Sequence, residues 1–295
     1  MAVMTGQQSN LREPAGWRRT KNRIATVLMV VSFVLVVIPL VFVLITVVAR
    51  GISIISWQFL TADIPPQVVP ADVGGIGPAI VGTIEIVALA TIMAVPLGIL
   101  GAIYLNEYGG RGVLARLIGF MADVMTGVPS IVMGLFIFSI WVLHFQFSGF
   151  AGALALGCLM LPVVIRSTDE MLKLVPNPLR EGSYALGATK ARVTMTVVLP
   201  AAIGGIVSGA LLAVARAAGE TAPLLFTILT VTTVNRNPFS GPNTSIPSQI
   251  FANATSPYPG AQDRAWGAAL TLVVIAFAFM IAARIVTARF TRYSR

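Results

Sequence analysis

The long apolar runs of this sequence are its most restrictive feature, because they determine the environment in which the chain must fold. Residues 24–48 contain no charged side chain, and a helix needs about 20 mainly apolar residues to cross the hydrocarbon core of a membrane. Charged residues make up 11% of the chain, whereas a soluble domain contains about 25%. We therefore predict an all-α, polytopic membrane protein.

Six transmembrane helices account for the apolar runs. The first is expected to be retained, since it is much longer than the roughly 7–15-residue core of a signal peptide. The expected helices lie at 24–48, 79–105, 117–143, 150–166, 201–228 and 265–287. The chain thus divides into a tail (1–23), the first helix (24–48), an outer loop (49–78), a five-helix core (79–287) with an inner loop at 167–200 and an outer loop at 229–264, and a second tail (288–295).

The basic residues orient these helices. Cytoplasmic loops of membrane proteins carry an excess of Lys and Arg, and most of the 20 Lys and Arg residues fall on one side if the N-terminus is cytoplasmic. The outer side then holds only Arg50, Arg236 and Arg264. Both termini are therefore predicted to be cytoplasmic, and topology explains the net charge of +9 without a nucleic-acid partner.

The fifth predicted helix carries two charges beside a helix-breaking residue. Its sequence Ala-Arg-Ala-Ala-Gly-Glu-Thr-Ala-Pro (215–223) places Arg216 and Glu220 on one helix face. A charge at the bilayer centre costs about 2.5–3.5 kcal/mol, and Pro223 should bend or open the helix, as at the substrate sites of transporters. The arginine fork suits an oxyanion. The alternative is a buried ion pair that only holds helices together.

The inner loop at 167–200 is charged but has the pattern of two short helices. Asn177 is a candidate N-cap, and Pro178 suits the first helical position, where its missing N–H carries no penalty. Gly187 predicts the end of this helix, and Thr189 predicts the cap of a second helix that runs to 199–200. The alternative is an ordinary interfacial loop.

This loop resembles the inner loop of ABC importer permeases. The family's "EAA" pattern is Glu-Ala-Ala, three residues, Gly, nine residues, Ile, one residue, Leu-Pro. The matching positions are Glu181, Gly187, Leu199 and Pro200, and the substituted ones are Gly182, Ser183 and Val197. The resemblance implies a type I (MetI-like) permease, in which Glu181, Gly182, Ser183, Gly187 and Ala188 couple the chain to a separate ATPase subunit.

A longer resemblance narrows the family to the phosphate-specific permeases of the PstA type. It covers roughly 75–290 and is carried by residues 126–132 (Thr-Gly-Val-Pro-Ser-Ile-Val), 161–166 (Leu-Pro-Val-Val-Ile-Arg) running on to 173–176, and 213–226. It implies that Arg216 and Glu220 are the charged pair of phosphate passage, that Arg166 is a second basic residue on the path, and that Pro223 breaks the helix. The alternative for Arg166 is a positive-inside anchor.

The resemblance also implies an assembly and a mechanism. The expected partners are a PstC-like permease in a heterodimer, a dimer of PstB-like ATPases and a PstS-like phosphate-binding protein, in a bacterial cell membrane. ATP binding in the motor would drive alternating access for phosphate. The chain has no Gly-x4-Gly-Lys-Ser/Thr phosphate loop. It is therefore expected to be a transport subunit and not an enzyme, with neither cofactor nor metal.

Three other functions stay open. A permease for another oxyanion (molybdate, sulfate or phosphonate) would share the inner loop but should lack the full 216–226 segment. A secondary transporter or channel would work without an ATPase. A membrane-embedded enzyme would need a metal cluster or a nucleophile–base pair, and one histidine with scattered carboxylates argues against it.

Several polar residues have no clear role in this interpretation. His144 is expected at a membrane interface, and the lone Cys158 excludes an intrachain disulfide. Glu85 and Asp123, near the ends of the second and third helices, either face the path or lie at an interface. The outer loop at 229–264 is expected to be a docking surface, and its two glycosylation sequons, at 243–245 and 253–255, are weak signals.

Overall fold

The structure, a computed structural model, describes residues 16–65, 73–110 and 112–292. Most of the predicted tail 1–23, the basic residues Arg12, Arg111 and Arg295, and the last three residues of the predicted tail 288–295 lie outside the described residues. The chain divides into two compact units, Met1–Ala49 and Arg50–Arg295. Within the described ranges no β-strand is present apart from one isolated bridge, between Ser148 and Gly241.

The first unit consists of most of helix α1 (Gly16–Gly51). The helix begins inside the predicted tail 1–23, and its stretch Arg19–Gly51 is long and apolar enough to cross a membrane. Pro39 lies within the helix without ending it, as membrane helices allow.

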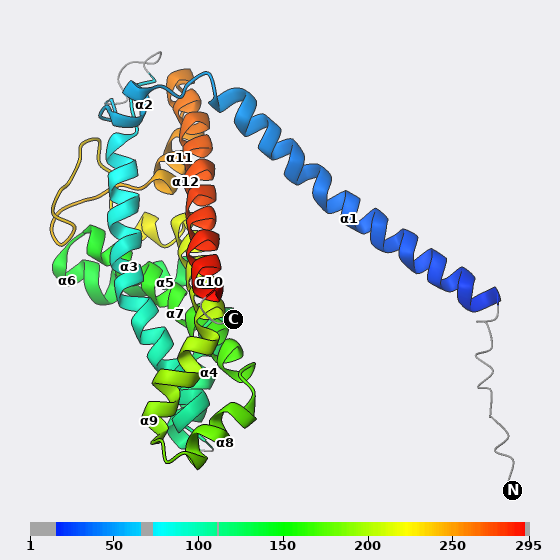
Figure 1. The fold of residues 1–295 in the computed structure, drawn as a ribbon. Coiled ribbons are helices and arrows are strands. Elements are labelled where there is room, and N and C mark those ends of the chain that lie inside the picture. Colours follow the sequence, from blue (N-terminus) through cyan, green and yellow to red (C-terminus); the bar gives the residue numbers. More distant parts are fainter. Residues whose placement is uncertain (1–15, 66–72, 111, 293–295) are drawn as a thin grey trace, which may run out of the picture. The chain divides into compact units, whose positions relative to one another are not determined.

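The second unit contains the other helices (Figure 1). In chain order they are α2 (Trp57–Thr61), α3 (Gly77–Ile103), η1 (Tyr104–Tyr108), α4 (Val113–Gly127), α5 (Ser130–Ile137), η2 (Phe138–Val142), α6 (Leu143–Phe145), α7 (Gly149–Lys173), α8 (Asn177–Ala185), α9 (Lys190–Val193), η3 (Thr194–Val198), α10 (Leu199–Ala218), η4 (Leu224–Phe226), α11 (Ile246–Ala254) and α12 (Pro259–Arg292). In the described part of the chain, five helices are long and apolar enough to span a membrane, and the bent stretch from α4 to α6 makes a sixth if it is one span. The prediction of an all-α, polytopic membrane protein is confirmed.

Helix α7 is the centre of the second unit, where it contacts α3, α4, α5 and α10. Alanine, valine and other aliphatic side chains of α3, α7 and α10 form the largest core. Small residues let these helices approach closely: a Cβ added at Gly98 would lie 2.7 Å from Val164, and one at Gly209 would lie 2.4 Å from the Ser167 hydroxyl. Since lipid is as apolar as leucine, close van der Waals packing of this kind is what holds membrane helices together.

The region predicted as one helix over 117–143 is divided in two, so that prediction is wrong. The stretches before and after the break are bent by 108° relative to each other. Val128 and Pro129 lie at the break with extended backbone, at ψ of 126° and 136°. A proline pushes the residue before it out of the helical region and cannot donate the hydrogen bond that a continuous helix needs. The break leaves the N-terminus of α5 open.

Helix α10 ends at Ala218, well before the end predicted at 228. Gly219 is its C-cap, and in a continued helix the ring of Pro223 would clash with the Gly219 carbonyl. The helix therefore stops instead of bending, and the chain continues through turns into η4.

At its other end α10 is continuous with the inner loop. Lys190–Ala218 forms a single 29-residue stretch through α9, η3 and α10, so the prediction of a second helix that ends at Leu199 and Pro200 is wrong. Pro200 cannot donate to a carbonyl one turn earlier. The wider π-helical turn η3, closed by the Leu199 amide on the Thr194 carbonyl, lets the helix pass this point.

The predicted outer loop at 229–264 is partly folded into the unit. Asn243 is buried and donates to the Glu85 carboxylate on α3 over 3.4 Å. Asn253 is buried as well, so neither sequon asparagine is accessible for glycosylation. Gly82 on α3 allows this close approach, because a Cβ there would lie 2.0 Å from a carbonyl oxygen of the loop. The loop is thus structured, and Glu85 belongs to its attachment.

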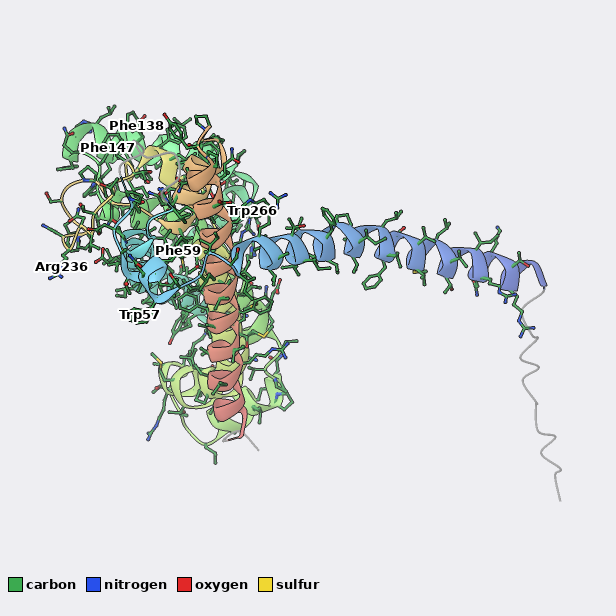
Figure 2. All side chains as sticks on the ribbon, turned by 90° about the horizontal axis from the view of Figure 1, so that it is seen from above. Trp57, Phe59, Phe138, Phe147, Arg236 and Trp266 are labelled. Carbon is green, nitrogen blue, oxygen red and sulfur yellow. The ribbon has the colours of Figure 1, made fainter. Side chains whose placement is uncertain are left out.

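Aromatic side chains gather where α7 begins. The rings of Phe138 and Phe147 lie side by side, with centroids 6.2 Å apart (Figure 2). Trp141 meets Phe150 edge-on at 5.3 Å, and His144 is exposed close by. Aromatic belts of this kind occur at membrane–water interfaces.

Candidate substrate site and inner loop

A cavity of about 270 Å³ opens between the α4–α5 break, the middle of α7 and the C-terminal end of α10. The α4–α5 break lines one side with Thr126 and Ser130, and α7 lines another around Pro162, a proline inside the helix. The C-terminal end of α10 contributes Arg216, and the turn that follows it contributes Glu220. The structure therefore brings the two charged residues of the predicted substrate site into one cavity.

Arg216 and Glu220 form a loose ion pair. Arg216 Nε and Glu220 Oε1 are 3.7 Å apart, farther than the N–H···O range of about 2.7–3.2 Å. The Arg216 side chain is 72% exposed and the Glu220 side chain 22%. An exposed pair of this kind contributes only about 0–1 kcal/mol. The pair is therefore not the buried structural pair that was the alternative, and the guanidinium keeps donors available.

The N-terminus of α5 faces the same cavity, because its N-cap Pro129 and its first residue Ser130 line it. Pro129 supplies no side-chain cap to the first amides of the helix. Unpaired amides and the helix dipole make such an end favourable for an anion. The helix end and the guanidinium of Arg216 thus independently favour a negatively charged ligand.

Sequence reasoning missed Thr126 and Ser130 as cavity residues. They flank the Gly-Val-Pro stretch at which the helix breaks. Residues 126–132 served only as evidence of family resemblance, and no role in substrate binding was predicted for them. A helix break that exposes backbone and hydroxyl groups within an apolar region was the available signal.

Arg166 lies outside this cavity, one turn beyond Pro162 on α7. Its Nη2 donates to the Gly119 carbonyl over 3.1 Å and forms an ion pair with Asp123, both on α4. Arg166 therefore ties α7 to α4 and gives Asp123 a partner. The structure does not bring it together with Arg216.

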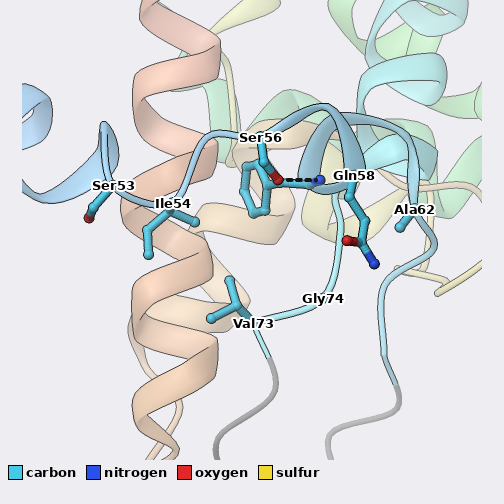
Figure 3. Close-up of a pocket in the computed structure, with 8 residues that line it drawn as sticks. Ser53, Ile54, Ser56, Gln58, Ala62, Val73 and Gly74 are labelled. Atoms are coloured by element: carbon cyan, nitrogen blue, oxygen red, sulfur yellow. Dashed lines mark hydrogen bonds between the residues drawn. The ribbon is translucent and has the colours of Figure 1, made fainter.

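A second cavity, of about 320 Å³, lies beside α2 (Figure 3). Its wall includes the start of α2, where the Ser56 hydroxyl caps the helix by accepting from the Phe59 amide over 3.1 Å. The described residues that line this cavity carry no charged side chain. It therefore lacks the cation that an oxyanion needs, and the cavity with Arg216 is the better candidate.

The five predicted coupling residues lie together on α8 and the turn that follows it. Glu181, Gly182 and Gly187 are exposed, and Ser183 and Ala188 are half-buried. Gly187 has a φ of +80°, the left-handed conformation that ends a helix at glycine. A Cβ added at Gly182 or Gly187 would meet nothing within 4 Å, so this surface is open to a partner.

The caps of the two inner-loop helices agree only in part with the prediction. Pro176, and not Asn177, is the N-cap of α8, and the Asn177 Oδ1 accepts from Arg180 over 3.2 Å instead. The predicted cap Thr189 is confirmed, since its hydroxyl accepts from the Arg192 amide.

Leu186, at the tip of the inner loop, is a residue that the sequence reasoning overlooked. Its side chain is 90% exposed, and Leu174, Leu179 and Tyr184 are exposed nearby in the chain. Large apolar side chains exposed close together in sequence on a charged loop make it a candidate protein contact. Leu186 is one of the three unspecified positions of the EAA pattern, so the resemblance predicted no role for this leucine.

A bundle of membrane-spanning helices with a charged cavity at paired helix breaks is the architecture of a transport subunit. Residues 94–292 match the family described as "Binding-protein-dependent transport system inner membrane component". The chain is also 44% identical to the phosphate transport system permease protein PstA 1 of Mycobacterium tuberculosis (strain ATCC 25618 / H37Rv), over 94% of this chain and 91% of that protein. It is 41% identical to the PstA of Yersinia pestis, over 94% of each chain. The chain therefore belongs to the binding-protein-dependent inner membrane permeases and, within them, to the PstA family.

Solved structures share the fold at low sequence identity. A chain of a bacterial alginate ABC transporter superposes with a TM-score of 0.64 at 14% identity, over 95% of this chain and 99% of that one. A chain of the MetNI methionine ABC transporter gives 0.57 at 16% identity, over 73% and 94%. The chain is thus a multi-pass inner membrane transport subunit with the fold of an ABC importer permease.

Proposed function

We propose that this chain is the permease subunit of an ATP-driven importer for inorganic phosphate. The observation that carries the proposal is the under-bonded Arg216 in a cavity that also receives the N-terminus of α5. The similarity to PstA proteins over almost the whole chain supports phosphate as the ligand. Family membership also argues against a secondary transporter, a channel or an enzyme.

The proposed chemistry needs only noncovalent contacts. The planar guanidinium of Arg216 donates two parallel hydrogen bonds to a phosphate oxygen pair, and the first amides of α5 donate to a further oxygen. Glu220 accepts a hydrogen bond from the hydroxyl of hydrogen phosphate. Because Arg216 is largely exposed, the site holds phosphate weakly, which a transporter needs for release on the other side.

Arg166 serves a different step in this proposal. It lies beyond the cavity, toward the inner end of α7, and its charge is partly satisfied by Asp123. It acts as a secondary attraction for phosphate that leaves the Arg216 site toward the cytoplasm. This assignment makes Arg166 less important for transport than Arg216.

The inner loop is proposed as the coupling element. Leu186 and the open surface around Gly182 and Gly187 dock on a PstB-like ATPase dimer, while a PstC-like permease completes the pore and a PstS-like protein delivers phosphate from outside. The excess of Lys and Arg on this side supports cytoplasmic termini and an inner loop between α7 and α10 that faces the cytoplasm.

Uptake of radiolabelled phosphate tests the proposal. Bacteria that lack their own PstA-type permease would express this chain with its cognate partner subunits, as wild type, Arg216→Ala or Arg236→Ala. Arg236 is an exposed arginine of the outer loop that does not line the cavity, so its variant is the matched control. Quantitative blotting of membranes would equalise the amounts of complex.

We expect uptake by wild type and by Arg236→Ala, and a loss of at least about tenfold in Arg216→Ala. Equal uptake by all three would reduce Arg216 to a structural residue. If the assembled wild-type complex took up labelled molybdate or sulfate but no phosphate, the chain would be a permease for another oxyanion.

A further inference from the structure

A single arginine attaches the inner loop to two membrane-spanning helices. Arg180 on α8 forms an ion pair with Glu107 on η1, the π-helical extension of α3, with Nη2 and Oε1 3.0 Å apart. Its Nη2 also donates to the Leu172 carbonyl over 2.9 Å and its Nη1 to the Val175 carbonyl over 2.6 Å. The Leu172 carbonyl belongs to the last turn of α7, and Val175 lies just after the C-cap of that helix, Leu174. One guanidinium therefore contacts η1, the last turn of α7 and the turn that follows it.

These contacts satisfy polar groups at a helix end and in a buried position. The Leu172 carbonyl already accepts from the Val175 amide over 3.3 Å, and Arg180 gives it a second donor. A cation at a helix C-terminus is also favoured by the helix dipole. The Glu107 side chain is only 4% exposed and the Arg180 side chain 13%. A carboxylate buried to this extent needs a charged or hydrogen-bonded partner.

Helix α8 has little else to hold it to α3 and α7. None of its residues is buried, and its more extensive contacts are with α9 and η3, on the other arm of the loop. The apolar cluster beneath the loop is formed by Val175 and by residues of α3, α7, α9, η3 and α10, and α8 contributes none to it. The rigid connection between α8 and the two membrane-spanning helices therefore depends on Arg180.

We propose that Arg180 is a positioning residue for transport, the joint through which a displacement of α8 reaches α3 and α7. The proposal rests on the function proposed above, in which α8 moves with the ATPase. Helix α7 is continuous from this joint to Pro162 at the substrate cavity, about 15 Å away at 1.5 Å per residue. A guanidinium fixed by Glu107 and by the Leu172 and Val175 carbonyls can transmit force in more than one direction.

The number of phosphate ions transported per ATP hydrolysed is the quantity that tests this joint. The complete complex would be purified, placed in proteoliposomes with its binding protein, and assayed for phosphate uptake and ATP hydrolysis in parallel. The variants are Arg180→Ala, Arg180→Lys and Glu107→Gln. Lys173→Ala is the matched control. Lys173 lines a cavity of about 450 Å³ together with Glu107 and Arg180, but its side chain is 60% exposed and pairs with Asp169 on its own helix.

We expect Arg180→Ala to hydrolyse ATP but to lose about tenfold in phosphate transported per ATP, within the usual range for coupling between distant sites. Arg180→Lys keeps the charge but cannot reach the three acceptors at once, so its ratio should fall less, by about threefold. The ratio of Lys173→Ala should equal that of wild type. A role in stability alone would lower uptake and hydrolysis together, through the amount of complex, and would leave the ratio unchanged.

Two results would overturn the inference. One is an unchanged ratio in Arg180→Ala. The other, decisive if Arg180→Ala does not assemble, is an unchanged ratio in both Arg180→Lys and Glu107→Gln. Failure of the proposed function itself would be seen separately, as a wild-type complex that moves no phosphate when ATP and the binding protein are present.

Discussion

Two arginine–glutamate pairs of the described residues have surroundings that differ in nearly every respect. Arg180 and Glu107 are both largely buried, lie 3.0 Å apart, and come from parts of the chain that are 73 residues apart. Arg216, at the C-terminal end of α10, and Glu220, just beyond that end, lie 3.7 Å apart and face an open cavity. The first guanidinium has acceptors on two membrane-spanning helices, whereas the second keeps its donors available.

This difference separates a structural use of arginine from a binding use. A buried guanidinium must have its donors paired, and once paired it cannot take a ligand without leaving a carboxylate unsatisfied. An exposed guanidinium held loosely by one carboxylate loses little when an oxyanion replaces that partner. Residue type and a nearby glutamate are therefore poor guides to function, and the number of satisfied donors is a better one.

Removing the carboxylate from each pair should give the largest contrast. We expect Glu107→Gln to lower the free energy of unfolding by about 3 kcal/mol, because it leaves the charge of Arg180 buried without its counter-ion. Glu220→Gln should lower it by less than about 1 kcal/mol, since that pair is exposed and loose. Denaturant unfolding of the purified complex in detergent would measure both. Equal losses would show that the two pairs do not differ as described.

A second substitution tests the comparison more closely, because it keeps the positive charge at position 216 and changes the shape of the side chain. Arg216→Lys retains a cation in the cavity but replaces a planar fork of donors by a point charge. We expect phosphate uptake to fall about tenfold with no change in the unfolding midpoint, because bidentate contact is lost and no structural bond is. Uptake equal to wild type would indicate that charge alone is sufficient, and a lower midpoint would mean that Arg216 is structural after all.

The candidate cavity could be predicted from the sequence only in part. Arg216 and Glu220 interrupt an apolar run at helical spacing, so their shared location followed from local pattern alone. The α4–α5 break could not be predicted from local pattern. Prolines alone do not mark breaks in this chain, because Pro39, Pro96 and Pro162 all lie inside helices that continue through them. A proline permits a break, and packing decides whether one occurs.

Two contacts between distant parts of the chain illustrate why the rest of the site could not be predicted from the sequence. A Cβ at Gly134 on α5 would lie 2.7 Å from the Cα of Pro223, so the break and the end of α10 fit against each other across a long sequence separation. Likewise, no local pattern pairs Arg180 with Glu107. The membrane-spanning helices themselves followed from hydropathy, because hydrophobic length is a local property, whereas ion pairs between distant elements are not.

Two glycines on the inner loop should respond in opposite directions to alanine. Gly187 has a left-handed backbone, so Gly187→Ala should destabilise the end of α8 by about 1 kcal/mol. Gly182 lies in the helix with open space around it, so Gly182→Ala should stabilise α8 by about 0.5–1 kcal/mol. Hydrogen exchange of the α8 amides would measure both changes. A stabilising Gly187→Ala would mean that α8, and with it the setting of Arg180, differs from the helix described.

A further ion pair of the described residues, Arg166 with Asp123, lies between the two extremes and should give the smallest effect. Arg166 is partly exposed and Asp123 is mostly exposed, but Arg166 also donates to the Gly119 carbonyl. Asp123→Asn should therefore lower the free energy of unfolding by only a few tenths of a kcal/mol. Phosphate uptake should not fall, because the change frees the charge of Arg166 without removing it. Uptake as low as in Arg216→Lys would place Asp123 on the substrate path. The number of satisfied guanidinium donors would then no longer distinguish an arginine that holds the structure together from one that acts in transport.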